Sequence, residues 1–125
     1  MNIIISNSSS EPIYEQIKKA IKQAIYTNEL KEEEILPSVR VLANDLKISF
    51  LTVKKAYDEL EAEGFIKTVQ GKGSYVLPKN LELLREEKLK ELEKNISTVV
   101  KLSKIYGITE GEVINLIKIM FEEDL

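Results

Sequence analysis

Residues 36–76 read LPSVRVLANDLKISFLTVKKAYDELEAEGFIKTVQGKGSYV, and this stretch decides the fold. Ser38 can cap a short helix by accepting hydrogen bonds from free backbone amides, and that helix is expected to end near Lys47. Ser49 is a second capping residue, and it opens a longer helix that runs to Glu63. Few residues separate the two helices, so the stretch predicts a pair of helices joined by a tight turn.

The spacing of apolar residues changes from a helical to a strand-like pattern after the longer helix. Gly64 can adopt, at no steric cost, the left-handed conformation that ends a helix. Phe65–Val69 and Ser74–Leu77 are rich in β-branched and aromatic residues and have the length of strands. The glycine-rich Gln70–Gly73 separates them, and Pro78 follows the second. The pattern predicts a β-hairpin with a glycine-rich tip.

A further helix is expected before this stretch. Apolar residues recur at helical spacing from Ile13 to Ile25, directly after Pro12, which predicts an amphipathic helix that ends near Asn28. Its opposite face is expected to carry the charged residues Glu15, Lys18, Lys19 and Lys22. Three helices followed by a β-hairpin is the element order of a winged helix-turn-helix module.

The C-terminal residues 79–125 contain no proline and two glycines, which predicts a long helix, a turn and a final helix. Thr109–Glu112 has the pattern of a capping box at the start of the final helix. The long helix carries an apolar seam with alternating steps of three and four residues, the spacing that faces a partner helix. The final helix is apolar on most sides and therefore needs cover.

A second copy of the chain or a fold back onto its own first helix would cover these two helices. We favour a second copy, because symmetric homodimers are the commonest way to bury such a surface. The expected dimerisation residues are Leu89, Leu92, Ile96, Val99, Tyr106, Val113, Leu116, Ile117 and Met120. The expected fold class is α+β and mostly helical, with a winged helix-turn-helix domain over residues 1–78 and a two-helix dimerisation region over residues 79–125.

Composition argues against an enzyme. The chain has 125 residues, of which 43% are hydrophobic and 31% charged, and it contains neither His nor Cys. Disulfides, thiol nucleophiles, imidazole bases and the usual zinc ligands are therefore excluded, and we expect no metal or cofactor. The remaining candidates are carboxylates at helical spacing, which we interpret as solvated flanks of the seam. They are Glu86, Glu87, Glu91 and Glu93.

No targeting signal is recognisable. Ile3–Ile5 is a short apolar cluster that runs into the polar Ser6–Ser10, without basic residues before it, so it fits neither a secretory signal nor a membrane span. No later apolar run approaches the length of a membrane span. We expect a cytoplasmic protein without a membrane partner.

Helical geometry identifies the side chains that the helix after the turn presents. If Val53, Ala56, Tyr57 and Leu60 are buried, a helix of 3.6 residues per turn directs the other face outward. That face consists of Leu51, Lys54, Lys55, Asp58 and Ala62. Its lysines can reach phosphates or guanine edges, and its leucine can contact a thymine methyl. The alternative is an ordinary solvated face with an apolar residue that holds the turn together.

Two basic residues outside this helix have the same two interpretations. Lys72 stands between Gly71 and Gly73 at the hairpin tip, where the lack of Cβ atoms lets the backbone approach a phosphate closely. Arg40 lies in the first turn of the preceding helix and is either a surface charge or a phosphate contact.

Several motifs together resemble the DNA-binding domain of GntR-type bacterial transcription regulators. They are PIYEQI at residues 12–17, LPSVR at 36–40, TVKKAY at 52–57, GFI at 64–66 and QGKGSYV at 70–76. They cover roughly residues 10 to 78, and the combination is specific although each piece alone is weak. Two helices after the hairpin, with no large effector domain, resemble the short YtrA-like branch of the family.

The resemblance implies a homodimeric repressor on a pseudo-palindromic operator, often of a membrane-transporter operon that includes its own gene. Arg40 and Lys54 match basic residues that contact DNA in the family, and Thr52 matches a hydroxyl near the DNA backbone. Phe50 departs from the arginine that family members commonly carry there, and Glu32–Glu34 replaces a glycine-containing turn. The expected DNA-binding residues are Ser38, Arg40, Ser49, Phe50, Leu51, Thr52, Lys54, Lys55, Gly71, Lys72 and Gly73.

The net charge of −3 counts against a strongly basic nucleic-acid surface. Four acidic residues crowd the far end of the longer helix, namely Asp58, Glu59, Glu61 and Glu63. The basic residues lie elsewhere, at the start of this helix, on the preceding helix and at the hairpin tip. We therefore expect double-stranded operator DNA and a second copy as partners, with weak non-specific binding by each protomer.

The alternative function is a winged module for protein association; no motif identifies a small-molecule effector.

Overall fold

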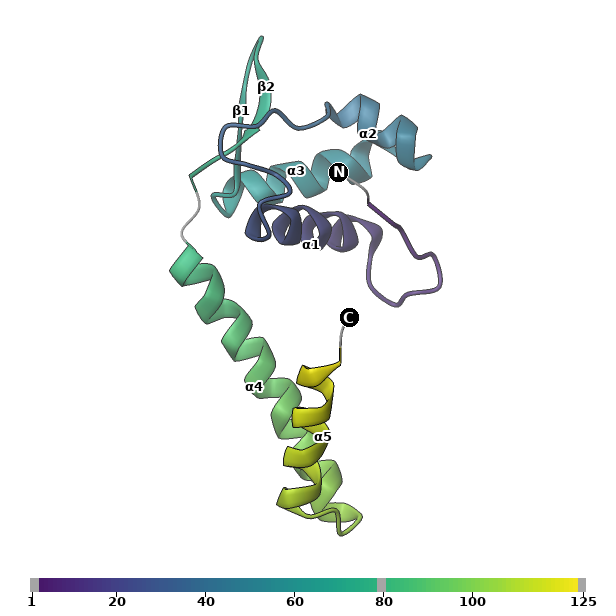
Figure 1. Cartoon of the computed structure of the whole chain (residues 1–125). Helices are drawn as coiled ribbons and strands as arrows, with labels where there is room; N and C mark the ends of the chain where they lie inside the picture. The colour runs from purple at the N-terminus through teal and green to yellow at the C-terminus, as the bar shows by residue number, and fades with distance from the viewer. Residues whose placement is uncertain (1–2, 79–80, 124–125) are drawn as a thin grey trace. The chain divides into compact units, whose positions relative to one another are not determined.

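The computed structural model describes residues 3–78 and 81–123 and divides the chain into two compact units, residues 1–80 and 81–125. The elements are α1 (Ile13–Tyr26), α2 (Val39–Leu46), α3 (Phe50–Ala62), β1 (Ile66–Val69), β2 (Gly73–Val76), α4 (Leu81–Ile105) and α5 (Glu110–Glu122) (Figure 1). The predicted α+β, mostly helical fold with a winged helix-turn-helix is confirmed. The predicted domain boundary after residue 78 falls beside residues 79–80, outside the described residues.

Both helices of the central motif begin at the predicted caps. The Ser38 hydroxyl accepts a hydrogen bond from the Val41 amide at 3.1 Å, and the Ser49 hydroxyl accepts one from the Leu51 amide at 3.1 Å. Gly64, with φ +86°, follows the end of α3 in the left-handed conformation that its position predicted. These caps satisfy amides that a helix start leaves free, and they fix where each helix begins.

The core of the first unit forms around α3, which packs against α1, α2 and β1 (Figure 1). Its largest fully buried side chains come from α1, α3 and both strands. They are Ile17, Ile21, Ile25, Val53, Leu60, Ile66 and Val76. The Tyr57 hydroxyl donates to the Pro37 carbonyl at 2.7 Å and so ties α3 to the segment before α2. Burial raises the pKa of Tyr57, so this hydroxyl remains a donor at neutral pH.

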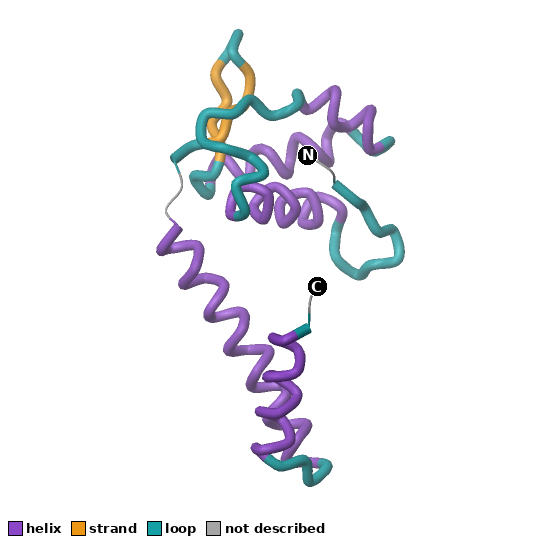
Figure 2. The backbone as a smooth tube through the Cα atoms, in the orientation of Figure 1, coloured by secondary structure: helices purple, strands orange, loops and turns teal. Residues whose placement is uncertain are grey.

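The hairpin has a short third partner that the sequence analysis did not predict. β1 and β2 pair antiparallel from Ile66↔Val76 to Val69↔Gly73 (Figure 2). The loop before α2 pairs with the other edge of β2, where the Leu36 amide donates to the Ser74 carbonyl at 2.8 Å. Pairing on both edges fixes the base of the hairpin to the entry of α2.

Element ends differ from the predicted ones by one or two residues. β1 begins at Ile66 rather than Phe65, because the Phe65 amide donates to the Leu60 carbonyl and still belongs to the end of α3. α1 ends at Tyr26 rather than near Asn28, which has φ +65°. Left-handed backbone cannot continue a right-handed helix.

The second unit consists of α4, a turn and α5 (Figure 1). Gly107 adopts φ +66° in the turn, and the predicted capping box is present. The Thr109 amide donates to the Glu112 carboxylate at 2.8 Å, and the Glu112 amide donates to the Thr109 hydroxyl at 3.2 Å. Ser103 is buried in the last turns of α4, where its hydroxyl donates to the Val99 carbonyl at 2.8 Å.

Glu33 with φ +65° and Lys47 with φ +56° have left-handed backbone although neither is glycine or asparagine. Left-handed backbone is unfavourable for residues with a Cβ atom, although glycine also loses more entropy on folding. We expect Glu33→Gly and Lys47→Gly each to raise the free energy of unfolding by about 0.5 kcal/mol, measured by urea denaturation of the full chain. Glu32→Gly, at a neighbouring position without positive φ, should lower it instead; an equal loss in all three variants would contradict the argument.

Candidate nucleic-acid interface

The exposed face of α3 is the one that helical geometry predicted. Val53 and Leu60 are fully buried, whereas Leu51 is 71% exposed and Phe50 44% exposed. Lys54 and Lys55 are also exposed. The buried stripe therefore sets the rotation of α3 about its axis and decides which side chains reach a neighbouring molecule.

Both lysines of this face have partners within the chain. The Lys54 ammonium lies 2.8 Å from the Asp58 carboxylate, one turn further along α3. The Lys55 ammonium lies 4.0 Å from the ring centroid of Tyr14 in α1. An exposed ion pair contributes little and is screened by salt, so Lys54 can exchange its carboxylate for a phosphate at small cost.

The other predicted residues of α2 and α3 lie at the starts of these helices. The Ser38 and Ser49 hydroxyls are occupied as caps, although both residues are exposed. Arg40 is exposed in the first turn of α2, and Thr52 is half-buried in the first turn of α3. This end of the motif thus presents one guanidinium together with two capping hydroxyls.

The hairpin tip forms a separate part of the candidate interface (Figure 1). Gly71 and Gly73 have φ +83° and +98°, which explains why the tip contains glycines. Apart from Gly71 and its chain neighbours, no atom would lie within 4 Å of a Cβ added to Gly71, so this part of the tip is open to close approach. Lys72 is exposed between them, and its ammonium lies 4.5 Å from the ring centroid of Tyr75.

A charge cluster at the far end of α3 was not predicted. Lys18 of α1 was expected on the solvated face, and that prediction is wrong: the residue is 7% exposed. Its ammonium lies 2.9 Å from the Glu59 carboxylate and 2.7 Å from that of Glu63, and Lys22 also contacts Glu63 at 2.8 Å. The acidic end of α3 was the sequence signal that such a partner existed, since buried ammonium groups require one.

The cluster shifts the pKa values of both partners. Burial alone lowers the pKa of Lys18, but hydrogen bonds to Glu63 and Glu59 outweigh it and raise the pKa overall. Burial likewise raises the pKa of Glu63, and its bonds to Lys18 and Lys22 lower it overall. Both groups are therefore charged at neutral pH, and the carboxylates at this end of α3 are largely compensated.

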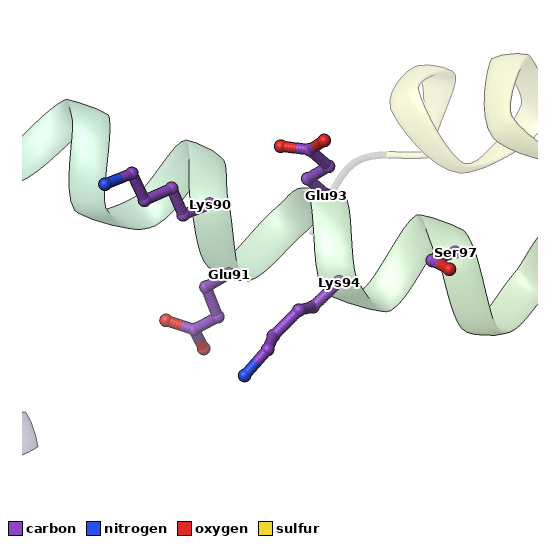
Figure 3. Close-up of a pocket in the computed structure, with 5 residues that line it drawn as sticks. All are labelled: Lys90, Glu91, Glu93, Lys94 and Ser97. Atoms are coloured by element: carbon purple, nitrogen blue, oxygen red, sulfur yellow. The ribbon is translucent and has the colours of Figure 1, made fainter.

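Among the described residues, 3–78 and 81–123, no cluster of three or more carboxylate, imidazole or thiol side chains could hold a metal ion, and no helix is long and apolar enough to cross a membrane. A depression on α4 is lined by Lys90, Glu91, Glu93, Lys94 and Ser97 (Figure 3). Its lining comes from one helix and is mostly charged, unlike the apolar, concave lining of ligand pockets.

The capped helix pair, the exposed face of α3 and the glycine-tipped hairpin define a winged helix-turn-helix DNA-binding protein. The family model for the bacterial regulatory proteins of the gntR family matches residues 13–76. The chain belongs to this family, as the motifs of the sequence indicated.

Known relatives agree in sequence and fold. The HTH-type transcriptional repressor YtrA of Bacillus subtilis (strain 168) is 38% identical over 98 residues, 78% of this chain and 75% of that protein. A GntR family transcriptional regulator from Listeria monocytogenes has a TM-score of 0.73 and 33% identity, over 89% of this chain and 96% of that chain. AraR(DBD), solved in complex with operator ORX1, has a TM-score of 0.54 and 25% identity, over 61% of this chain and 95% of that chain. The chain is therefore a DNA-binding transcription regulator and not an enzyme.

The ion pairs of Glu63 predict loss of stability in acid. Its folded-state pKa lies below the ordinary value of 4.5, so its carboxylate stabilises the fold above that pH and loses this contribution as pH falls through the lowered pKa. The raised pKa of Lys18 acts oppositely: its contribution persists up to its ordinary value of 10.5 and is lost above it.

We expect the urea midpoint to fall steeply below about pH 4.5, and Glu63→Gln to reduce this dependence while lowering stability at neutral pH. Glu32→Gln, on the exposed loop before α2, serves as the control and should keep the wild-type dependence. Equal acid dependence in the wild type and Glu63→Gln would contradict the role of the cluster.

Proposed function

We propose that the chain is a homodimeric repressor that binds a pseudo-palindromic operator, with one half-site for each protomer. In this proposal α3 enters the major groove, while Arg40 and the hairpin tip contact phosphates. The observation that carries it is the rotation of α3, which buries Val53 and Leu60 and exposes Leu51, Lys54 and Lys55. The relatives support it, since one is a transcriptional repressor and another was solved in complex with an operator.

The charge of the chain supports binding by two protomers together. With a net charge of −3, a single protomer has little general attraction for phosphates. When two DNA-binding domains are joined in one dimer, binding of the first to its half-site raises the effective concentration of the second at the other half-site. The proposal therefore places useful affinity in the dimer and in the right sequence.

The exposed apolar surface of α4 and α5 supports a second copy as the partner. Of the nine predicted dimerisation residues Val113 is half-buried, and the other eight are exposed, with Leu89 at 45%, Ile96 at 47% and Met120 at 60%. These apolar side chains are grouped on two helices rather than scattered singly over the surface, and a symmetric dimer would bury them.

The similarity to YtrA-like regulators further suggests the operon and the compartment. We propose a membrane-transporter operon that includes the regulator's own gene as the target. An operator-binding protein must reach the chromosome, so we also propose a cytoplasmic location.

The DNA-binding residues predict two kinds of variant. Arg40→Ala and Lys72→Ala should each weaken binding to all duplexes, because each removes a phosphate contact. Each should also reduce the slope of log binding constant against log salt concentration by about one for each protomer. Lys54→Ala should change which base pairs are preferred. Fluorescence anisotropy with the chain's own upstream region and with random duplex, over a range of salt concentrations, measures both effects.

The matched control is Lys101→Ala on α4, an exposed lysine outside the candidate interface that should leave binding unchanged. If the wild-type chain bound its upstream region no more tightly than random duplex at the same salt, operator binding would be ruled out.

The dimer predicts that a charge in the seam dissociates it. Ile96→Glu should convert a dimer to a monomer in light scattering and lower operator affinity. It places an unpaired carboxylate at the centre of the seam that the proposed dimer would bury. Lys101→Glu introduces the same charge on the opposite face of α4 and should leave the dimer intact. A wild-type chain that is monomeric at micromolar concentration would contradict the proposal.

A further inference from the structure

The first turn of α3 presents apolar side chains to the outside. Phe50 and Leu51 are the first two residues of the helix and are 44% and 71% exposed. Neither belongs to the buried core, and neither is among the partly buried apolar residues that pack against it. Packing within the described residues therefore does not explain why two large apolar side chains stand at this end of the helix.

The first turn of α3 itself carries no side chain that reads a base by a pair of hydrogen bonds. Residues 49–53 are Ser, Phe, Leu, Thr and Val, without an amide or a guanidinium. The Ser49 hydroxyl caps the helix, and Thr52 is half-buried. Lys54 follows this turn and pairs with Asp58; its ammonium can contact a guanine edge but cannot read an apolar group.

Base edges in the major groove carry one apolar group, the C5-methyl of thymine. The N-terminal residues of a recognition helix are the ones that contact base edges. We propose that Phe50 and Leu51 determine specificity by packing on thymine methyl groups, so that each operator half-site carries thymine where the first turn of α3 meets the groove. This inference rests on the proposed operator binding and adds the chemical group that is read.

The test removes the methyl and the side chain separately. The operator is first obtained by selection of bound duplexes from a random pool with the full chain. Each thymine of a half-site is then replaced by deoxyuridine, which lacks only the methyl, and dissociation constants are measured by fluorescence anisotropy at fixed salt. We expect wild-type binding to weaken about fourfold for each contacted methyl that is removed, the factor for burial of one such group.

The side-chain variants decide whether these residues make the contact. In Leu51→Ala or Phe50→Ala the same deoxyuridine should have no further effect, because the methyl has lost its partner. Ile4→Ala removes a 91% exposed apolar side chain outside α2, α3 and the hairpin, and it should keep the full wild-type sensitivity. Replacing the contacted T·A pair by 5-methylcytosine·guanine should bind more tightly than unmethylated cytosine·guanine.

The outcomes separate this inference from the proposed function. Specific operator binding with no deoxyuridine effect at any thymine would overturn the methyl contact and leave operator binding intact. A deoxyuridine effect of equal size in the wild type and in both alanine variants would overturn the assignment to Phe50 and Leu51. Failure of the selection to enrich any sequence would instead overturn operator binding itself. Circular dichroism of each variant should give the wild-type spectrum, which checks that the substitution leaves the chain folded.

Discussion

The rotation of α3 about its own axis is the constraint on which the candidate interface depends. Burial of Val53 and Leu60 against α1 and β1 sets that rotation, and the Tyr57 hydroxyl fixes it against the Pro37 carbonyl at 2.7 Å. A turn of the helix by one residue position, about 100°, would bury a lysine and expose the core stripe. The outward side chains are therefore selected by the core, although none of them belongs to it.

The same helix resolves the apparent conflict between an acidic chain and a nucleic-acid partner. Its acidic end is held by Lys18 and Lys22 of α1, so Glu59 and Glu63 are compensated within the fold rather than facing DNA as free charges. Charges that are paired in a fixed geometry act at short range, and salt screens what remains. Overall net charge is consequently a poor guide to the potential at the start of α3.

Sequence patterns predicted the elements, the caps and the exposed face of α3, because these depend on local spacing and on single capping residues. They did not predict the burial of Lys18, since periodicity assigns a lysine to the solvated face and its carboxylate partner Glu59 lies 41 residues away. The pairing of the loop at Leu36 with β2 was missed for a similar reason: it is a backbone contact between segments distant in sequence. The sequence pattern also did not predict whether Phe50 is buried, because this residue lies at the edge of the buried stripe of α3.

If the first turn of α3 reads methyl groups, specificity and affinity have different physical origins in this chain. Apolar contact with a methyl is short-ranged and independent of salt, whereas phosphate contacts are long-ranged and weaken as salt rises. An acidic chain with few phosphate contacts then loses little specificity in salt but starts from a low affinity for any duplex. In the proposed dimer, assembly through α4 and α5 would supply the missing affinity by joining two half-sites. The apolar surface of the second unit would then add affinity to the specificity that the apolar turn of the first unit provides.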